Sequence, residues 1–108
     1  MPAPRPGRAA RGTTTGRPIM VLLDLLGRRW TLRICSELLA AEALGFNELQ
    51  ARCAGVSPSV LSQRLRELVE ARIVEADAGR YRLTKLAREL SGPLQALDAW
   101  ATRWARAR

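Results

Sequence analysis

The sequence contains no histidine in 108 residues, and this absence excludes several kinds of active site. Without histidine there is no Ser-His or Cys-His nucleophile pair, and the commonest general base and metal ligand are both missing. No glycine-rich phosphate-binding loop and no convergent set of carboxylates stands in its place. We therefore expect a protein that is not an enzyme and that uses no metal or other cofactor.

Cysteine is scarce as well, with only Cys35 and Cys53. Two cysteines without a CxxC partner are too few for a zinc site. Each lies among apolar neighbours on a predicted helix, so we expect reduced, buried thiols. Redox sensing by one of them is the alternative, although neither has neighbours that would stabilise a thiolate.

Long apolar runs are also missing. No stretch approaches the length of a membrane span, and no apolar segment follows the basic N-terminus as a secretory signal requires. We expect a cytoplasmic protein. The chain is long enough for one domain with a modest core.

Positive charge is abundant: 18 basic residues face 10 acidic ones, giving a net charge of +8. Of the basic residues only Lys85 is a lysine, which is also compatible with codon bias in a GC-rich genome. A domain this basic is suited to a polyanion, and nucleic acid is the first candidate.

The segment 46–71 has the pattern of a helix-turn-helix. Asn47, with Gln50 three residues later, predicts a capping box at the start of a short helix. Gly55 can adopt the positive φ of the turn that follows. Ser57 then predicts the cap of a second helix, and Pro58 fits its first turn because no N–H is needed there.

The second helix of this segment is amphipathic. Its predicted apolar stripe consists of Leu61, Leu65, Leu68 and Val69. Ser59, Gln63, Arg66 and Glu70 lie opposite, and Val60, Ser62 and Glu67 lie on the flanks. A merely solvated outer face is the simpler interpretation. After a helix-turn-helix turn in so basic a chain we favour DNA contact, since Gln can bond adenine bidentately, Arg can bond guanine, and Ser lets the backbone approach.

Two helices and a basic arm precede this segment. Residues 1–17 have no periodicity and carry Arg5, Arg8, Arg11 and Arg17, which predicts a disordered arm that either binds DNA or is an inert tail. Residues 19–26 and 30–41 are predicted helices. In the second of them Trp30 is expected to pack at the start, rather than to stack on a ligand.

A hairpin and a final helix follow it. Residues 73–77 and 80–83 predict two strands around Ala78-Gly79. We interpret this hairpin as a wing whose Arg80 and Arg82 contact phosphate; a plain hairpin that closes the core is the alternative. Thr84 is expected to cap the final helix, which Gly92-Pro93 must kink or break.

The apolar residues at the two ends of the domain predict a subunit interface. Beyond the proline, Leu94, Leu97, Trp100 and Trp104 recur at helical spacing. They either fold back on the domain or pack against a second subunit. We expect a homodimer, since a terminal helix has few neighbours in its own chain. The first helix contributes Ile19, Leu22 and Leu23 to the same interface.

Taken together, the motifs resemble the HxlR-type winged-helix regulators. The resemblance rests on Leu-Gly-x-x-Trp-Thr (26–31), Gly-Phe-Asn-Glu-Leu (45–49), Val-Ser-Pro-x-x-Leu-x-x-Arg-Leu-x-x-Leu (56–68) and Tyr-x-Leu-Thr (81–84). It implies a mainly α fold with a small β-hairpin wing, over residues 18–108, in a bacterial or archaeal homodimeric transcription factor. By position, the DNA-facing candidates are Ser59, Ser62, Gln63, Arg64 and Arg66.

Three features depart from the family's pattern. Arg17 stands where many relatives have a redox-sensing cysteine, so thiol sensing of that type is not expected. The hairpin is several residues shorter than in most relatives, so the resemblance does not decide whether its tip reaches a DNA groove. Arg72 replaces an expected glycine, so the turn after the recognition helix must form without the residue that adopts positive φ most easily.

The resulting hypothesis is a sequence-specific transcriptional regulator that binds a pseudo-palindromic operator, with half-sites about one helical turn apart. A DNA-binding protein without sequence preference and a protein–protein adaptor are the alternatives. A small apolar effector near Trp30, Trp100 or Trp104 is possible, but no polar group defines its identity. In each subunit the helix that begins at Ser57 is expected to read bases, while Arg28, Arg29, Arg80 and the arm bind phosphate. The expected DNA-binding residues are Arg28, Arg29, Ser57, Ser59, Ser62, Gln63, Arg64, Arg66, Arg80 and Arg82.

Overall fold

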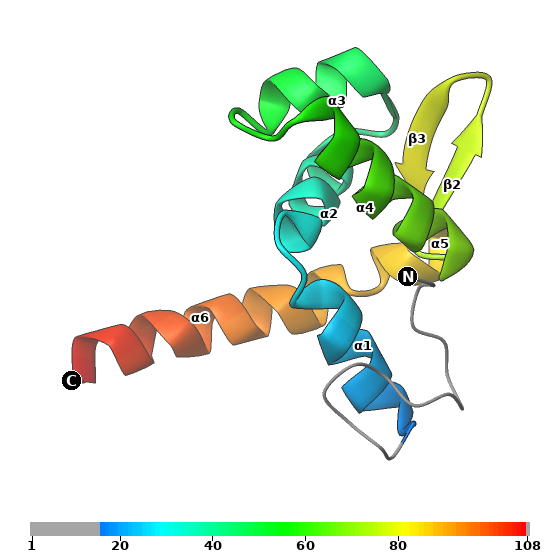
Figure 1. Ribbon diagram of the computed structural model, residues 1–108. Helices are drawn as coiled ribbons and strands as arrows, with labels where there is room; N and C mark the ends of the chain where they lie inside the picture. The colour runs from blue at the N-terminus through cyan, green and yellow to red at the C-terminus, as the bar shows by residue number, and fades with distance from the viewer. Residues whose placement is uncertain (1–15, 108) are drawn as a thin grey trace.

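The computed structural model describes residues 16–107, which form six helices and a three-stranded antiparallel sheet. The predicted mainly α, winged helix-turn-helix class is confirmed (Figure 1). Most of the predicted N-terminal arm, including Arg5, Arg8 and Arg11, lies outside the described residues. Its role therefore stays a prediction.

Two helices begin the described chain. Helix α1 spans Pro18–Leu26 with Pro18 at its first position, where the missing N–H leaves no bond unmade. Helix α2 spans Thr31–Ala40. The residue before α2, Trp30, has a φ of 76°, a conformation rarely adopted by a bulky side chain. Its ring packs against the core, as expected.

The helix-turn-helix consists of α3 (Phe46–Arg52) and α4 (Pro58–Glu70). The predicted cap by Asn47 and Gln50 is wrong, because α3 begins at Phe46 and the main-chain N–H of Gly45 donates to Glu48 Oε1 at 2.9 Å. Gln50 instead donates to the Val56 carbonyl across the turn.

The turn of this motif is closed by a glycine and a tryptophan. Gly55 has a φ of 104°, as the turn requires. A Cβ added to Gly55 would lie 3.5 Å from the Trp30 ring. The indole thus lies directly against the turn that separates α3 from α4.

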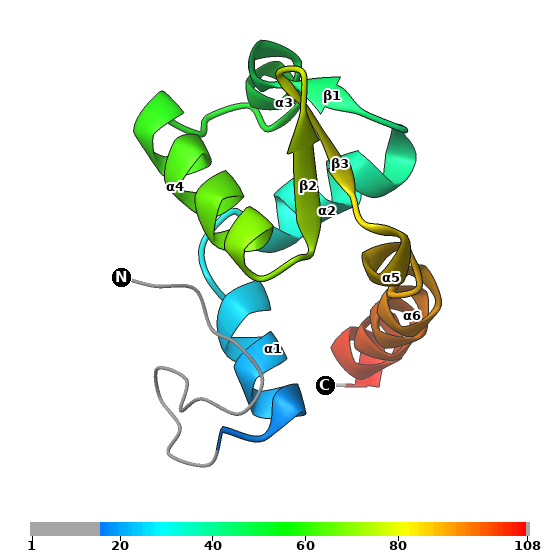
Figure 2. The ribbon, with the colours of Figure 1, turned by 90° about the vertical axis from the view of Figure 1, so that its right-hand side faces the viewer.

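The wing belongs to a three-stranded sheet with the order β1-β3-β2. Strands β2 (Val74–Asp77) and β3 (Arg80–Leu83) pair around Ala78-Gly79, where both turn residues have positive φ, as in the two-residue turns that match strand twist. Strand β1 (Leu44–Gly45) pairs with β3 and was not predicted, since two residues are too few to show a period. Figure 2 shows the hairpin beside α4.

The C-terminal region forms two helices rather than one kinked helix. Helix α5 spans Lys85–Arg88, and Thr84 Oγ1 accepts the N–H of Ala87 as expected. Helix α6 spans Ser91–Ala107, so the break lies before Gly92-Pro93 and not at it. Pro93 lies in the first turn of α6, where a backbone N–H would have no acceptor within the helix, so its missing N–H costs no hydrogen bond. Its ring disfavours a helix that continues from α5. In Figure 1, α6 projects away from the rest of the domain.

A single core fills the space between α2, α3, α4 and the sheet. Leu61, Leu65 and Leu68 of α4 are buried, as the pattern predicts. The assignment of Val69 to the same stripe is wrong, because 38 % of its surface is exposed beside the wing.

The turn after α4 forms with Arg72 at a φ of 63°. The N–H of Arg72 donates to the Val69 carbonyl and that of Ile73 to the Leu68 carbonyl, which is the bond pattern of a Schellman motif. Thr84 Oγ1 also donates to the Arg72 carbonyl at 3.0 Å. These bonds hold an arginine where the glycine expected from the family would fit without strain.

Candidate nucleic-acid interface

The outward face of α4 is polar and accessible. Ser57 caps the helix by accepting the Val60 N–H at 3.2 Å. Ser59, Ser62 and Arg66 are exposed, and Gln63 is half-buried at the edge of the same face. These four side chains occupy the positions that the sequence assigns to base contacts, and their role in binding stays a prediction.

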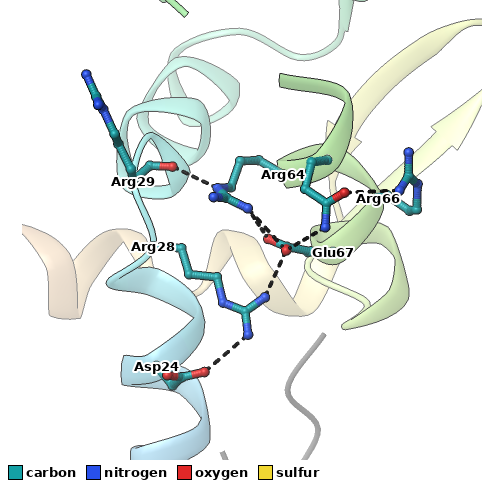
Figure 3. A network of polar contacts seen from close by, with 7 residues as sticks. Asp24, Arg28, Arg29, Arg64, Arg66 and Glu67 are labelled. Atoms are coloured by element: carbon teal, nitrogen blue, oxygen red, sulfur yellow. Dashed lines mark hydrogen bonds and ion pairs between the residues drawn. The ribbon is translucent and has the colours of Figure 1, made fainter. Parts of the chain in front are cut away.

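A buried carboxylate lies beneath this face. Glu67, placed on a flank by its helical position, is only 4 % exposed. It accepts hydrogen bonds from Gln63 Nε2 at 3.1 Å and from Arg64 Nη1 at 3.0 and 3.1 Å, and it pairs with Arg28 Nη1 at 2.9 Å (Figure 3). A buried charge persists only when it is paired in this way.

Arg28 is the other buried charge of the network. The expectation that it binds phosphate does not fit its position, since it is 6 % exposed. Its guanidinium lies between Glu67 and Asp24 of α1, whose carboxylate is 3.3 Å from Arg28 Nη2. We therefore remove Arg28 from the phosphate-binding set. It joins α1 to α4 instead (Figure 3).

Arg64 is also turned away from the outer face. Its Nε donates to the main-chain carbonyl of Arg29 at 2.9 Å, and its Nη1 reaches Glu67. Because these bonds direct its guanidinium to the Arg29 carbonyl and to buried Glu67, away from the outer face, we remove Arg64 from the base-reading set as well. Arg29 itself is exposed, with its guanidinium carbon 5.9 Å from the centre of the Trp30 ring.

The two remaining long side chains of the face are bonded to each other. Arg66 Nη1 donates to Gln63 Oε1 at 3.1 Å, while the other end of the Gln63 amide donates to Glu67. A continuous chain of polar contacts therefore runs from exposed Arg66 to Asp24 of α1.

The ionisation of Glu67 follows from these contacts. Burial by itself raises the pKa of a carboxyl group, but the hydrogen bond from Gln63 and the charges of Arg28 and Arg64 together hold the pKa of Glu67 below its usual value. Glu67 is therefore ionised at neutral pH and acts only as a hydrogen-bond acceptor.

The wing arginines are held by neighbouring residues. Arg80 Nη2 donates to the Ala43 carbonyl at 2.9 Å, and its Nη1 lies 3.3 Å from Glu48. The hydrogen bond from the Gly45 N–H and the charge of Arg80 lower the pKa of Glu48. Arg82 pairs with Asp77 at 3.5 Å. Both arginine side chains remain at least 39 % exposed, so their expected phosphate contacts stay predictions.

Apolar side chains are exposed on α1 and α6. Half or more of the surface of Ile19, Leu23, Leu97, Trp100 and Trp104 is accessible, and Leu22 and Leu94 are half-buried. The two indoles stack with ring centres 6.3 Å apart. Within the described residues the two indoles do not fold back on the domain. The other expected arrangement, packing against a second subunit, therefore stays the prediction.

Both cysteines are buried, as expected, and burial raises the pKa of Cys35 to about 11 and also raises that of Cys53. Among residues 16–107 no cluster of acidic or cysteine side chains is suited to a metal ion. In the same part of the chain no helix has the length and apolar character to cross a membrane.

A cavity of about 710 Å³ lies between α1, the end of α4 and α5. Its walls include Leu22, Ile73, Leu86 and Leu90. None of the three tryptophans contributes to it, so it differs from the effector pocket considered from the sequence.

Comparison with known proteins identifies the family. Residues 25–108 match the model of the HxlR-like helix-turn-helix family. The HTH-type transcriptional regulator YvaP of Bacillus subtilis (strain 168) is 33 % identical over 89 residues, covering 76 % of this chain and 82 % of YvaP. The reduced form of the B. subtilis transcriptional regulator YodB superposes with a TM-score of 0.77 at 28 % identity, over 84 % of this chain and 96 % of YodB. The quinone-bound form of YodB gives 0.75 at 30 % identity, over 79 % and 96 %. The chain therefore belongs to the HxlR-like helix-turn-helix family and is a DNA-binding transcriptional regulator of this winged-helix type.

Proposed function

We propose that the protein acts as a homodimer that recognises a specific, pseudo-palindromic operator. The observation that carries this proposal is the outward face of α4, where Ser59, Ser62 and Arg66 are exposed on a helix that follows a helix-turn-helix turn. The side chains are of the types that bond base edges in the major groove. The protein does so in the cytoplasm of a bacterium or archaeon, and it performs no catalysis.

The dimer would be formed by α1 and α6. Their exposed Leu23, Leu97, Trp100 and Trp104 are too large and too numerous to be left in water without cost. In Figure 1 both helices lie at the side of the domain away from α3 and the start of α4. A dyad through α1 and α6 would leave both recognition helices accessible, and it predicts half-sites about one helical turn apart.

Phosphate contacts would come from those expected phosphate-binding arginines that remain accessible. These are Arg29, Arg80 and Arg82, together with the arginines of the N-terminal arm. Deleting residues 1–16 tests the arm. If it binds phosphate, the deletion lowers the affinity for DNA and the slope of its salt dependence; if neither changes, the arm takes no part.

The central experiment is selection of bound DNA from a random pool, followed by footprinting and by the mass of the protein in solution. A symmetric motif and a dimer are expected. The net charge of +8 supports one other candidate, a DNA-binding protein without sequence preference. An affinity ratio near one between the selected sequence and bulk DNA would favour that candidate.

Two variants of the α4 face and one matched control then test base recognition. Arg66→Ala is expected to reduce discrimination between operator and random DNA by roughly 1–3 kcal/mol. Gln63→Ala should act in the same direction. Arg106→Ala removes the same charge from the last turn of α6 and should leave discrimination unchanged. Equal weakening on operator and random DNA by Arg66→Ala would contradict base reading by this face.

A further inference from the structure

We infer that Glu67 is a positioning residue for base recognition, because it fixes the amide orientation of Gln63 and, through Gln63, the guanidinium of Arg66. The inference rests on the proposed function of the α4 face and identifies a residue that does not itself touch DNA.

The first step is the chemistry of the Gln63 amide, which has a donor end and an acceptor end. An ionised carboxylate only accepts hydrogen bonds. With Glu67 Oε2 at 3.1 Å from Gln63, only the NH₂ end can face inward, and Oε1 must face Arg66 Nη1. The ionised Glu67 carboxylate thus determines the orientation of the Gln63 amide.

The second step is that Glu67 cannot easily turn away. Arg28 and Arg64 bind its two oxygens, and these arginines are themselves held by the Asp24 carboxylate and the Arg29 carbonyl. Figure 3 shows the carboxylate enclosed between both guanidinium groups. A side chain ordered before binding loses less entropy on meeting DNA, which favours precise recognition.

The third step concerns what the face offers to a base. Because the Gln63 NH₂ group faces Glu67 and the Gln63 carbonyl already accepts from Arg66, the groups that the pair offers outward are mainly the remaining N–H groups of Arg66. Guanine presents two acceptors in the major groove, N7 and O6, whereas adenine needs a donor and an acceptor together. The network therefore favours a G·C pair at the position that Arg66 and Gln63 contact, in contrast to the adenine expected from Gln63 alone.

The test uses Glu67→Gln in the full chain. The neutral amide can face Gln63 with either its oxygen or its NH₂ group, so the Gln63 amide would lose its single orientation. We expect the preference for G·C at this one pair of the half-site to fall about tenfold. Preferences at the other pairs should stay as in the wild type.

The matched control is Glu37→Gln. This variant also removes a partly buried carboxylate that is paired with two arginines, Arg33 at 3.0 Å and Arg52 at 3.8 Å, but Glu37 lies on α2. The base preferences of the Glu37→Gln protein should equal those of the wild type. Competition binding on operators altered one pair at a time, with circular dichroism to verify folding, gives the profile of each variant.

A double-mutant cycle separates positioning from general loosening. In the Gln63→Ala background, Glu67→Gln should have no further effect on the preference at this pair, because the amide through which it acts is gone. If Glu67→Gln does not fold, Glu67→Asp keeps the charge between the arginines but withdraws the oxygens from Gln63, and the same loss is expected.

The outcomes distinguish the two proposals. Wild-type protein with no preference at any pair would overturn the proposed function itself. A selective wild type whose profile is unaltered by Glu67→Gln or Glu67→Asp, or a loss that persists in the Gln63→Ala background, would overturn only the positioning role of Glu67.

Discussion

Replacing Arg28 by methionine should strongly destabilise the protein. Arg28 is 6 % exposed and lies between the carboxylates of Glu67, at 2.9 Å, and Asp24, at 3.3 Å. Methionine fills similar space but leaves Asp24 without this cation and Glu67 with fewer donors. Breaking a buried ion pair costs about 3–5 kcal/mol. We expect the lower end, roughly 3 kcal/mol, since Arg64 and Gln63 still bind Glu67.

The comparison variant is Arg33→Met. Arg33 also pairs with a glutamate, Glu37, at 3.0 Å, but its side chain is 54 % exposed. An exposed pair contributes about 0–1 kcal/mol. Urea unfolding followed by tryptophan fluorescence measures both variants at one protein concentration, because a dimer would make stability depend on concentration. Equal losses for the two variants, or a loss below about 1 kcal/mol for Arg28→Met, would refute the assigned role of the buried network.

Three further predictions follow from individual residues. The pKa of Glu67 is lower in the folded protein than in the unfolded chain, so its contribution to stability exists above the unfolded pKa and is lost as the pH falls through the folded pKa. From about pH 4.5 downward the wild type should therefore lose more unfolding free energy than Glu67→Gln, and parallel curves of stability against pH would contradict this. Arg72→Gly should stabilise the protein by roughly 1 kcal/mol, because glycine adopts the positive φ of this position without strain, whereas Arg72→Ala, which keeps a Cβ, should not. If both variants unfold at a higher temperature than the wild type, the gain comes from removing the arginine side chain instead. Cys35 and Cys53 should react with a thiol reagent only after unfolding, and rapid native labelling would reopen a redox role.

Much of the fold could be predicted from local patterns. The start of α4 at its Ser57 cap, the turn at Gly55 and the wing follow from caps, positive-φ residues and hydrophobic periods that act within a few residues, whereas the start of α3 does not follow from its predicted cap. Strand β1 could not be predicted, since its two residues are ordered only by pairing with β3.

The candidate site was predicted less completely. The spacing of Gln63, Arg64 and Glu67 on one helix allows contacts between them, which is a signal in the sequence. Nothing local indicates that Arg28 approaches Glu67 from the end of α1, and so the helical period predicts Glu67 on a flank and Arg28 at the surface. Charged residues are nearly always exposed, and only a partner distant in the chain reverses that expectation.

The sequence by itself determined the class of the protein, because the ordered helix-turn-helix and hairpin motifs together with the excess of arginine indicate a basic winged helix. The tertiary structure alone decided which arginines are available, because Arg28 and Arg64 are drawn to a carboxylate while Arg66 remains at the surface. The physical reason is that a helical period specifies the side of a helix on which a residue lies, whereas the partner of a buried charge depends on which elements pack together.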